Sequence, residues 1–441
     1  MEREHFEALT RAVLDRLPPG EDATIHLRGE RSEFVRLNHG KIRQAGTVTQ
    51  EQGLLRRIRG DRHASAGVTL GGRDLHDDVD RFVTAMHGLD DVLDVVPPDP
   101  HLRWCQEEGT TVEVQQGGPA PAESIITSVV EHSAGLDLVG LLTAGPLWTG
   151  FASSRGLQRW DERHGWLLDF SVVQGADRAI KSTLAGTEPA PDTIAARIEE
   201  IRSELPLLAI PPRRLEPGRY RAWLAPAAVA GLLGMVKRGG LSRRATETAQ
   251  SPLMRLIRGE CALSEQLTIT EDTAGGWGPA FTSDGFALPD RVPLIEGGEL
   301  VGTLTSPRSA QEYGVPGNSG PGEYPNALVM QPGTLPTSEA LAALGTGLWI
   351  SNLWYLNFSD RPAGRITGMT RFTTLWVEDG RVVCPVEVLR FDDTLYHLLG
   401  AGLEHLSDTA ELLPSTVHFE RRSTASDRVP GALIDAITFT L

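Results

Sequence analysis

The chain has 441 residues, of which 40% are apolar and 23% are charged, a composition typical of folded domains that excludes wholesale disorder. At about 150 residues per domain, this length predicts roughly three domains. The chain has 42 Lys and Arg residues and 58 Asp and Glu residues. The resulting net charge of −16 argues against binding to nucleic acid or to an anionic membrane surface.

The cysteines and the N-terminal segment predict a cytoplasmic protein. Cys105, Cys261 and Cys384 are spread over the whole sequence and cannot form a disulfide framework. Residues 1–16 are charged throughout and lack the apolar core of a signal peptide. The longest apolar run, at 222–236, is interrupted by a proline and is too short to cross a bilayer.

Clusters of proline and glycine divide the sequence into segments. We expect an N-terminal α+β unit over 1–95, a linker over 96–122, a middle α+β unit over 123–205 and a strand-rich C-terminal domain over 218–441. The expected fold class is therefore α+β, with mixed helix and antiparallel-sheet units followed by a large sheet or barrel that has few helices.

The N-terminal unit opens with a helical pattern, because Phe6, Leu9 and Val13 fall on one face. Alternating strands and a second helix follow. The strands are expected at 23–27, 34–37 and 53–59, with a hairpin turn at 38–40, and the helix at 74–86. The middle unit shows the same mixture. Its expected helices are 124–133 and 192–205, the second ended by Pro206, and its expected strands are 137–142, 147–153 and 166–173.

The C-terminal domain reads mostly as strands and turns. Two helices are expected, at 226–238 and 393–406. Strands are expected at 220–224, 267–271, 292–296, 300–305, 327–331, 348–358, 368–378 and 381–388, with glycine-containing hairpin turns at 296–299 and 378–381.

The common catalytic motifs are absent from this sequence. No P-loop motif occurs, and the run at 345–350 lacks the third glycine of a dinucleotide fingerprint. Ser319 lies in a glycine-rich loop that is one residue short of a nucleophile elbow, so a turn is the better interpretation. No two of the 12 histidines are four residues apart, which excludes H-E-x-x-H. We therefore predict no catalytic residue and no metal ligand in this chain.

One dense aromatic stretch remains, around Trp349, Trp354 and Tyr355. Core packing of a central strand would explain it. Alternatively, alternate side chains line a groove that binds a peptide or another apolar ligand. On that second interpretation the candidate cavity-lining residues are Trp354, Tyr355 and Asn357.

Several motifs follow one another in the C-terminal domain. Residues 283–287 read SDGFA and 291–302 read RVPLIEGGELVG, which resembles a "D-x-G-x-x…R-x-x-x-L-I-E-x-G-x-L-x-G" hairpin. Residues 309–318, SAQEYGVPGN, resemble an "S-A…G…G-N" loop, and 325–333, PNALVMQPG, a "P-x-N-L-x-x-x-P-G" strand end.

Two further stretches complete the pattern. Residues 366–368, ITG, followed by 377–386, VEDGRVVCPV, are similar to a "G…I-E-x-G-x-I-x-x-P-V" hairpin. In the N-terminal unit, residues 53–62, GLLRRIRGDR, resemble "G-x-G-x-R-V…G-x-x". Five such matches in this order resemble the TldD/PmbA family, whose PmbA-type members are also called TldE.

The resemblance implies a two-subunit metallopeptidase. In such pairs a TldD-type subunit binds a catalytic metal, usually zinc, through a helical H-E-x-x-x-H and a distant Cys, and the pair hydrolyses peptide or amide bonds in an enclosed cavity. The corresponding helix here, at 225–234, has Ala and Gly where the ligands would be, and Cys384 resembles the variable residue before Pro-Val. The chain thus looks like the metal-less, PmbA/TldE-type subunit, with zinc in its partner.

Three functions remain open at this level. The leading hypothesis is the non-catalytic subunit of a heterodimeric zinc metallopeptidase that acts on a peptide or natural-product precursor. The alternative is a partner-independent protein that binds or modulates a peptide or small molecule. A metal-independent hydrolase using Ser319 or Cys384 is the third. The net charge of −16 gives no support to a role at DNA.

Overall fold

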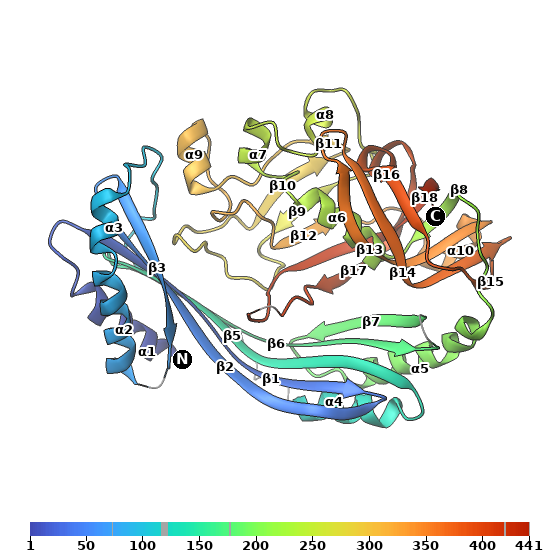
Figure 1. Ribbon diagram of the computed structural model, residues 1–441, viewed down its shortest axis with the longest axis horizontal. Helices are drawn as coiled ribbons and strands as arrows, with labels where there is room; N and C mark the ends of the chain where they lie inside the picture. Colours follow the sequence, from blue (N-terminus) through green and yellow to red (C-terminus); the bar gives the residue numbers. More distant parts are fainter. Residues whose placement is uncertain (73, 116–121, 176–177, 419, 441) are drawn as a thin grey trace.

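The computed structural model describes residues 1–72, 74–115, 122–175, 178–418 and 420–440 and confirms the α+β class (Figure 1). Within these residues, an N-terminal, largely antiparallel sheet of seven strands faces a C-terminal mixed sheet of eleven strands. No helix in these described ranges is long and apolar enough to span a membrane.

The seven-stranded sheet has the order β3-β2-β1-β5-β6-β4, with β7 paired to β6. Its central strands are long enough for one group of helices to pack near each end of the sheet. The strands are β1 (Asp22–Asn38), β2 (Lys41–Arg59), β3 (Arg62–Leu70), β4 (Gly109–Val114), β5 (Asp137–Ser153), β6 (Leu157–Val173) and β7 (Ala179–Gly186).

Two helix groups lie at opposite ends of this sheet (Figure 1). Near one end of β1, Ile25 and Leu27 pack with Phe6 of the first helix, while Val35 and Leu37 join a separate core at the other end. The helices are α1 (Arg3–Leu14), α2 (Leu75–His87) and α3 (Asp90–Val95) in one group, and α4 (Ala122–His132) and α5 (Pro191–Ala209) in the other. The expected N-terminal and middle units therefore share one sheet, and the domain boundaries at 95 and 123 stay a prediction.

The eleven-stranded sheet has the order β11-β10-β9-β12-β18-β16-β14-β13-β8, with β15 on β14 and β17 on β18. An additional β18–β8 pairing closes β8, β13, β14, β16 and β18 into a ring. The strands are β8 (Gly218–Leu224), β9 (Ile269–Asp272), β10 (Arg291–Glu296), β11 (Glu299–Leu300), β12 (Ala327–Met330), β13 (Gly347–Asp360), β14 (Arg365–Glu378), β15 (Arg381–Pro385), β16 (Arg390–Thr394), β17 (Leu403–Pro414) and β18 (Ser426–Phe439).

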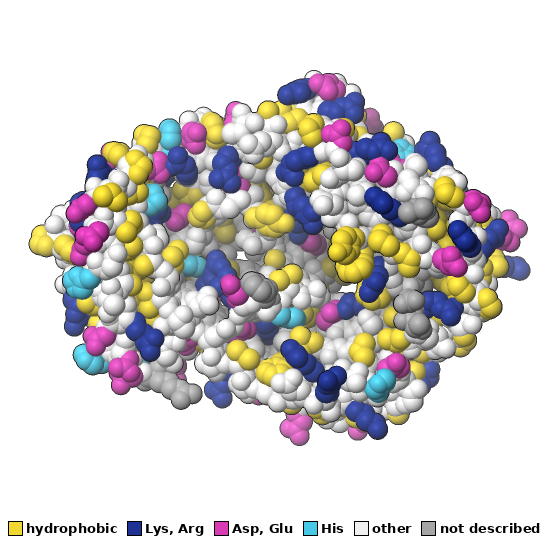
Figure 2. Space-filling view, in the orientation of Figure 1, with side chains coloured by type: hydrophobic (Ala, Val, Ile, Leu, Met, Phe, Trp, Pro, Cys, Tyr) yellow, Lys and Arg dark blue, Asp and Glu magenta, His cyan; other side chains and the backbone are white. Residues whose placement is uncertain are grey.

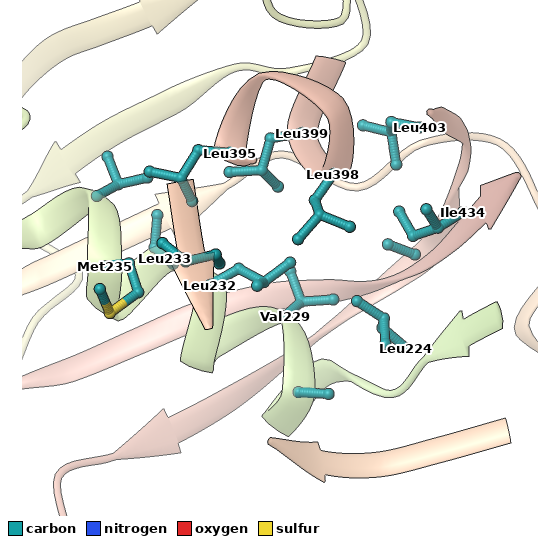
Figure 3. Packing of buried hydrophobic residues seen from close by; sticks show 14 of the residues in the cluster. Leu224, Val229, Leu232, Leu233, Met235, Leu395, Leu398, Leu399, Leu403 and Ile434 are labelled. Atoms are coloured by element: carbon teal, nitrogen blue, oxygen red, sulfur yellow. The ribbon is translucent and has the colours of Figure 1, made fainter. Parts of the chain in front are cut away.

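The helix α6 (Pro226–Lys237) is the centre of the C-terminal core (Figure 3). It begins at Pro226, whose fixed φ and missing N–H suit the first helical position, and Gly239 with φ +91° follows its end. Val229, Leu232 and Leu233 are fully buried, and the cluster around them includes Leu398, Leu399 and Ile434. The other helices here are short: α7 (Arg243–Glu247), α8 (Met254–Ile257), α9 (Pro307–Tyr313), α10 (Ala340–Leu344), η1 (Thr337–Glu339) and η2 (His397–Ala401).

The predicted hairpin turns are confirmed. His39 and Gly40 have φ of +51° and +67°, and Asp379 and Gly380 have +49° and +74°, the left-handed pairs that two-residue hairpins require.

Other predicted elements are wrong. The helix expected over 393–406 is a single turn, η2, between β16 and β17, because Gly400 has non-helical φ and ψ and Leu403 pairs with Ile434 of β18. Pro206 does not end α5, which continues to Ala209 and buries Leu208. The expected linker contains β4, which pairs in parallel with β6, and the patterns did not predict β7, β17 or β18.

Candidate functional site

A cavity of about 970 Å³ lies between the two sheets. Strands β1 and β5 form one wall, and the end of α6 with the loops before β10 and β12 forms another. The segment between β17 and β18, called the β17–β18 segment, completes the lining with residues 415–417 and 421–425. In Figure 2 the surface is hollowed between the N-terminal and C-terminal parts, with basic side chains near the edge of the hollow. The volume is at the upper end of the roughly 300–1,000 Å³ typical of ligand pockets.

The helix α6 reaches this cavity with side chains that cannot hold a metal. Ala230 and Lys237 are its lining residues, and its other side chains are apolar. A zinc site needs several Cys, His, Asp or Glu donors. Within the described ranges, no group of three or more such residues is placed to hold a metal ion. The side chains of this helix therefore do not fit a catalytic zinc ion.

The positive charge of Lys237, at the end of α6, is neutralised by a carboxylate. The Lys237 ammonium donates a hydrogen bond to Asp427 at the start of β18. Nearby, Glu271 Oε1 accepts the backbone N–H groups of Asn326 (2.8 Å) and Ala327 (3.1 Å). Burial raises the pKa of both Asp427 and Glu271, with Lys237 opposing the rise in each case.

The loop before β12 is anchored by a buried carboxylate. Glu323 accepts hydrogen bonds from Ser242 Oγ (2.5 Å), Arg244 N–H (2.8 Å), Ser306 N–H (3.0 Å) and Ser306 Oγ (2.9 Å). Burial alone would raise the pKa of this carboxyl, but these hydrogen bonds together with that of Ser309 outweigh it and lower the pKa. The neighbouring residues 320–322 and 324–326 line the cavity, so Glu323 holds that wall in place.

The turn at 284–285 joins the two sheets beside the cavity. The Gly285 carbonyl accepts a hydrogen bond from Arg159 Nε (2.9 Å), and Asp284 pairs with Arg56 (3.2 Å). Burial raises the pKa of Asp284, although Arg56 opposes it. Gly285 has φ +86°, and a Cβ there would lie 2.3 Å from the ring of Phe151. The D-x-G motif thus serves as a contact between the two parts of the chain.

The β17–β18 segment is fastened to the N-terminal sheet by Arg422. Its buried guanidinium donates hydrogen bonds to the carbonyls of Gly145 and Gly165, and its Nε lies 3.5 Å from Glu30. Burial lowers the pKa of Arg422, and Glu30 opposes that effect. Two further arginines, Arg28 on β1 and Arg421 beside Arg422, face the cavity.

The charge of these arginines acts on a histidine of the same wall. His26 is buried on β1, two residues before Arg28. Burial, followed by the positive charges of Arg28 and Arg421, lowers the pKa of His26 to about 3. The imidazole is therefore neutral at physiological pH.

The aromatic residues predicted to line a cavity lie elsewhere. Trp354 and Tyr355 are 47% and 72% exposed on β13, and Asn357 is exposed beside them. None of the three lines this cavity or a smaller one of about 40 Å³ near Trp166. Their role at a substrate stays a prediction that requires a surface outside this chain.

The aromatic pair nevertheless has a defined geometry. Trp354 and Tyr355 meet edge to face at 4.8 Å, where β13 bulges and Tyr355 takes φ +56°. The Arg371 guanidinium lies 4.3 Å from the Trp354 ring centroid. By contrast, Trp349 stacks on the buried Trp223 at 5.7 Å, as the core-packing interpretation predicts.

The two residues weighed as nucleophiles also lie outside the cavity lining. Ser319 is buried in its loop, where its N–H donates to the Thr305 carbonyl (3.1 Å). Cys384 is half-buried on β15 and packs against the C-terminal core. The sequence patterns did not single out Arg28 or Arg421, although Arg28 falls on the face of β1 opposite Ile25 and Leu27.

Solved structures with a similar fold match nearly the whole length of this chain. TldE from Thermococcus kodakarensis matches with a TM-score of 0.76 and 15% identity over 99% of this chain and 100% of that one. Candidate modulators of DNA gyrase match with TM-scores of 0.74 and 0.73 at 14% identity. The Thermotoga maritima match covers 99% of both chains, and the Bacteroides thetaiotaomicron match covers 100% of this chain and 99% of that one. No curated protein matches. Residues 217–441 match the PmbA/TldA metallopeptidase C-terminal domain, and the chain therefore belongs to the PmbA/TldD family.

Proposed function

We propose that this chain is the metal-less, TldE-like subunit of a heterodimeric metallopeptidase of the TldD/PmbA type. Its partner would be a TldD-type subunit that holds zinc through H-E-x-x-x-H, and the pair would hydrolyse peptide or amide bonds of a peptide or natural-product precursor. The observation that carries the proposal is the surface of α6, which offers Ala230 and Lys237 to the cavity where a catalytic subunit needs metal ligands.

The division of labour follows from the chemistry. When bound in the partner, zinc would polarise the scissile carbonyl and lower the pKa of a water molecule. The residues of this chain would instead shape the cavity and exclude water. Phe281 and Leu147 give its wall apolar surface, while the loop held by Glu323 and the segment held by Arg422 keep the wall rigid.

The exposed face of β13 supports pairing with another subunit. Trp354 and Tyr355 present large aromatic surfaces to solvent, and aromatic side chains are enriched at protein interfaces. We propose that these residues, with Asn357, contact the partner subunit or the substrate enclosed by the pair.

Co-expression with the proteins encoded beside this gene tests the proposal. We expect an H-E-x-x-x-H protein to co-elute with this chain in size-exclusion chromatography. Mass spectrometry of metals should find zinc only in fractions that contain the partner, and peptide hydrolysis should require both chains. Stoichiometric zinc and peptide cleavage by this chain alone would contradict the proposal.

A second candidate is a partner-independent binding protein. The size of the cavity favours it, because residues of a single chain line a volume of about 970 Å³. Peptide binding by the purified chain, with no co-eluting metalloprotein among the neighbours, would support this second function over the first.

A further inference from the structure

We infer that Arg28 and Arg421 form a carboxylate-binding site inside the cavity, which receives either the C-terminal carboxylate or an acidic side chain of a peptide. The identity of the ligand as a peptide rests on the proposed function. The site itself rests on the placement of the two guanidinium groups.

The two arginines come from distant parts of the sequence. Arg28 lies on β1, on the opposite face from Ile25 and Leu27, which pack under the helices α1 and α2. Arg421 comes from the β17–β18 segment and is adjacent to Arg422, which is itself bound to the N-terminal sheet. The fold therefore directs both side chains to the same open cavity from two walls, with Arg28 exposed at its surface and Arg421 half-buried.

The charges around the cavity are unbalanced. Its charged lining residues are Arg28, Lys237, Arg421, Arg422 and Asp427. Asp427 is paired with Lys237, and Arg422 is engaged by Glu30 and two carbonyls. Among the described residues, neither Arg28 nor Arg421 has a hydrogen-bond or ion-pair partner. Two free cations remain in a protein whose net charge is −16.

The nearest carboxylates do not supply the missing partner. Glu30 already accepts hydrogen bonds from Ser32 and Gln50 and lies beside Arg422, so its oxygens are occupied. Glu420 and Glu30 favour the charged form of Arg421 through space, yet neither is within ion-pair distance of it.

The electrostatic environment agrees with the lack of a direct partner for these two arginines. Burial, followed by the charge of Arg421, lowers the pKa of Arg28 to about 10, so it still carries its charge at neutral pH. Guanidinium groups normally pair with carboxylates or phosphates through two parallel hydrogen bonds. An incoming carboxylate would satisfy donors that the folded chain leaves free and would relieve the repulsion between the two cations.

The test is calorimetric titration of the full chain with three short probes. These are acetyl-tetraalanine with a free C-terminus, the same peptide with a C-terminal amide, and an amidated peptide in which one alanine is glutamate. We expect a carboxylate-bearing probe to bind at least about tenfold more tightly than the neutral amide, since hydrogen bonds between a guanidinium and a carboxylate are stronger than those to a neutral amide. The probe that binds identifies the source of the carboxylate.

The second part of the test removes the positive charge of each arginine in turn. Arg28→Gln and Arg421→Gln should each weaken the carboxylate-dependent binding by about 10–100-fold. Arg31→Gln is the matched control, because Arg31 is exposed on the same strand and does not line the cavity. Thermal unfolding of Arg28→Gln should occur at or above the wild-type temperature, since a poorly compensated charge is removed; this shows that weaker binding is not misfolding.

Equal binding of the neutral amide, no binding of either carboxylate probe, or equal loss in Arg31→Gln would overturn the inference. Tighter binding of inorganic phosphate than of every peptide would overturn it as well. The proposed function fails separately. A chain that binds carboxylates through these arginines but never pairs with a metal-holding subunit refutes only the heterodimer. An active pair that is insensitive to both arginine variants refutes only the carboxylate site.

Discussion

Arg422 donates a hydrogen bond to the carbonyl of Gly165 (3.0 Å), and this contact joins the β17–β18 segment of the C-terminal sheet to the β5–β6 hairpin of the N-terminal sheet. The same guanidinium also donates a hydrogen bond to the carbonyl of Gly145, a residue whose φ is +125°. One buried side chain thus fixes the relative position of two cavity walls, because residues on both sides of it line the cavity.

Replacing Arg422 with Met should destabilise the protein by about 3–5 kcal/mol, since the carbonyls of Gly145 and Gly165 lose their donor and the buried Glu30 carboxylate loses its neighbouring cation. Denaturant unfolding followed by fluorescence measures this change. Arg31→Met is the control, and as an exposed substitution it should shift stability by less than about 0.5 kcal/mol. Equal stability of the two variants would show that Arg422 does not hold the sheets together.

Gly285→Ala tests the contact between the 284–285 turn and the N-terminal sheet. The new Cβ would meet the Phe151 ring at 2.3 Å while φ is +86°, so we expect a loss of about 2–4 kcal/mol. Gly314→Ala is a matched control with φ +66° and open space around the added Cβ, and it should cost only about 1 kcal/mol. The difference between the two melting temperatures isolates the steric part, and no difference would contradict the close approach.

The buried Glu323 predicts a pH dependence of stability. Its pKa is lower in the folded protein than the ordinary 4.5, so its stabilising contribution is complete above pH 4.5 and is lost as pH falls through the folded value. Glu323→Gln should therefore be less stable than the wild type at pH 7, by about 1–3 kcal/mol, with the gap narrowing in acid. Denaturant titrations at several pH values check this, with the exposed Glu312→Gln as control. A constant gap at all pH values would be inconsistent with the prediction.

His26 predicts a separate acid sensitivity. Its pKa of about 3 in the folded state lies below the ordinary 6.5, so the unfolded chain takes up the proton first. This group lowers stability progressively as pH falls from about 6.5 towards 3, by an amount on the order of a few kcal/mol. His26→Asn should have a shallower stability profile across that window, while remaining folded at pH 7. Identical slopes for the two proteins would show that the imidazole is not buried in its neutral form.

Local patterns predicted the parts of the fold that depend on neighbouring residues. The turns at His39-Gly40 and Asp379-Gly380 follow from residues that tolerate positive φ, and α6 follows from its proline start and glycine end. The region around Gly400 could not be predicted in this way, because strand pairing with β18 overrides a helical pattern there.

The cavity was still harder to foresee from the sequence. Arg28 and Arg421 are separated by most of the chain, and neither belongs to a motif. Their juxtaposition depends on the Arg422 contact and on the 284–285 turn, both of which are tertiary interactions. In the structure Arg28 and Ile25 lie on opposite faces of β1, but the strand expected from the sequence, 23–27, ended before Arg28 and could not reveal what covers that face.

The final prediction concerns two tryptophans of β13. One variant tests binding to a partner, and the other tests packing in the core. Trp354 is half-exposed and touches Tyr355 and Arg371 at the surface, whereas Trp349 stacks on the buried Trp223. Trp354→Ala should therefore change the melting temperature of the isolated chain by only a degree or two. It should weaken association with the proposed TldD-type partner by at least tenfold, as expected for an aromatic residue at an interface. Trp349→Ala should instead destabilise the isolated chain by about 3–5 kcal/mol, since it removes a ring from a packed cluster. Sedimentation velocity with the purified partner measures the association. Unchanged affinity of the Trp354 variant would mean that β13 lies outside the interface, and the exposed pair would then have no part in enclosing the substrate.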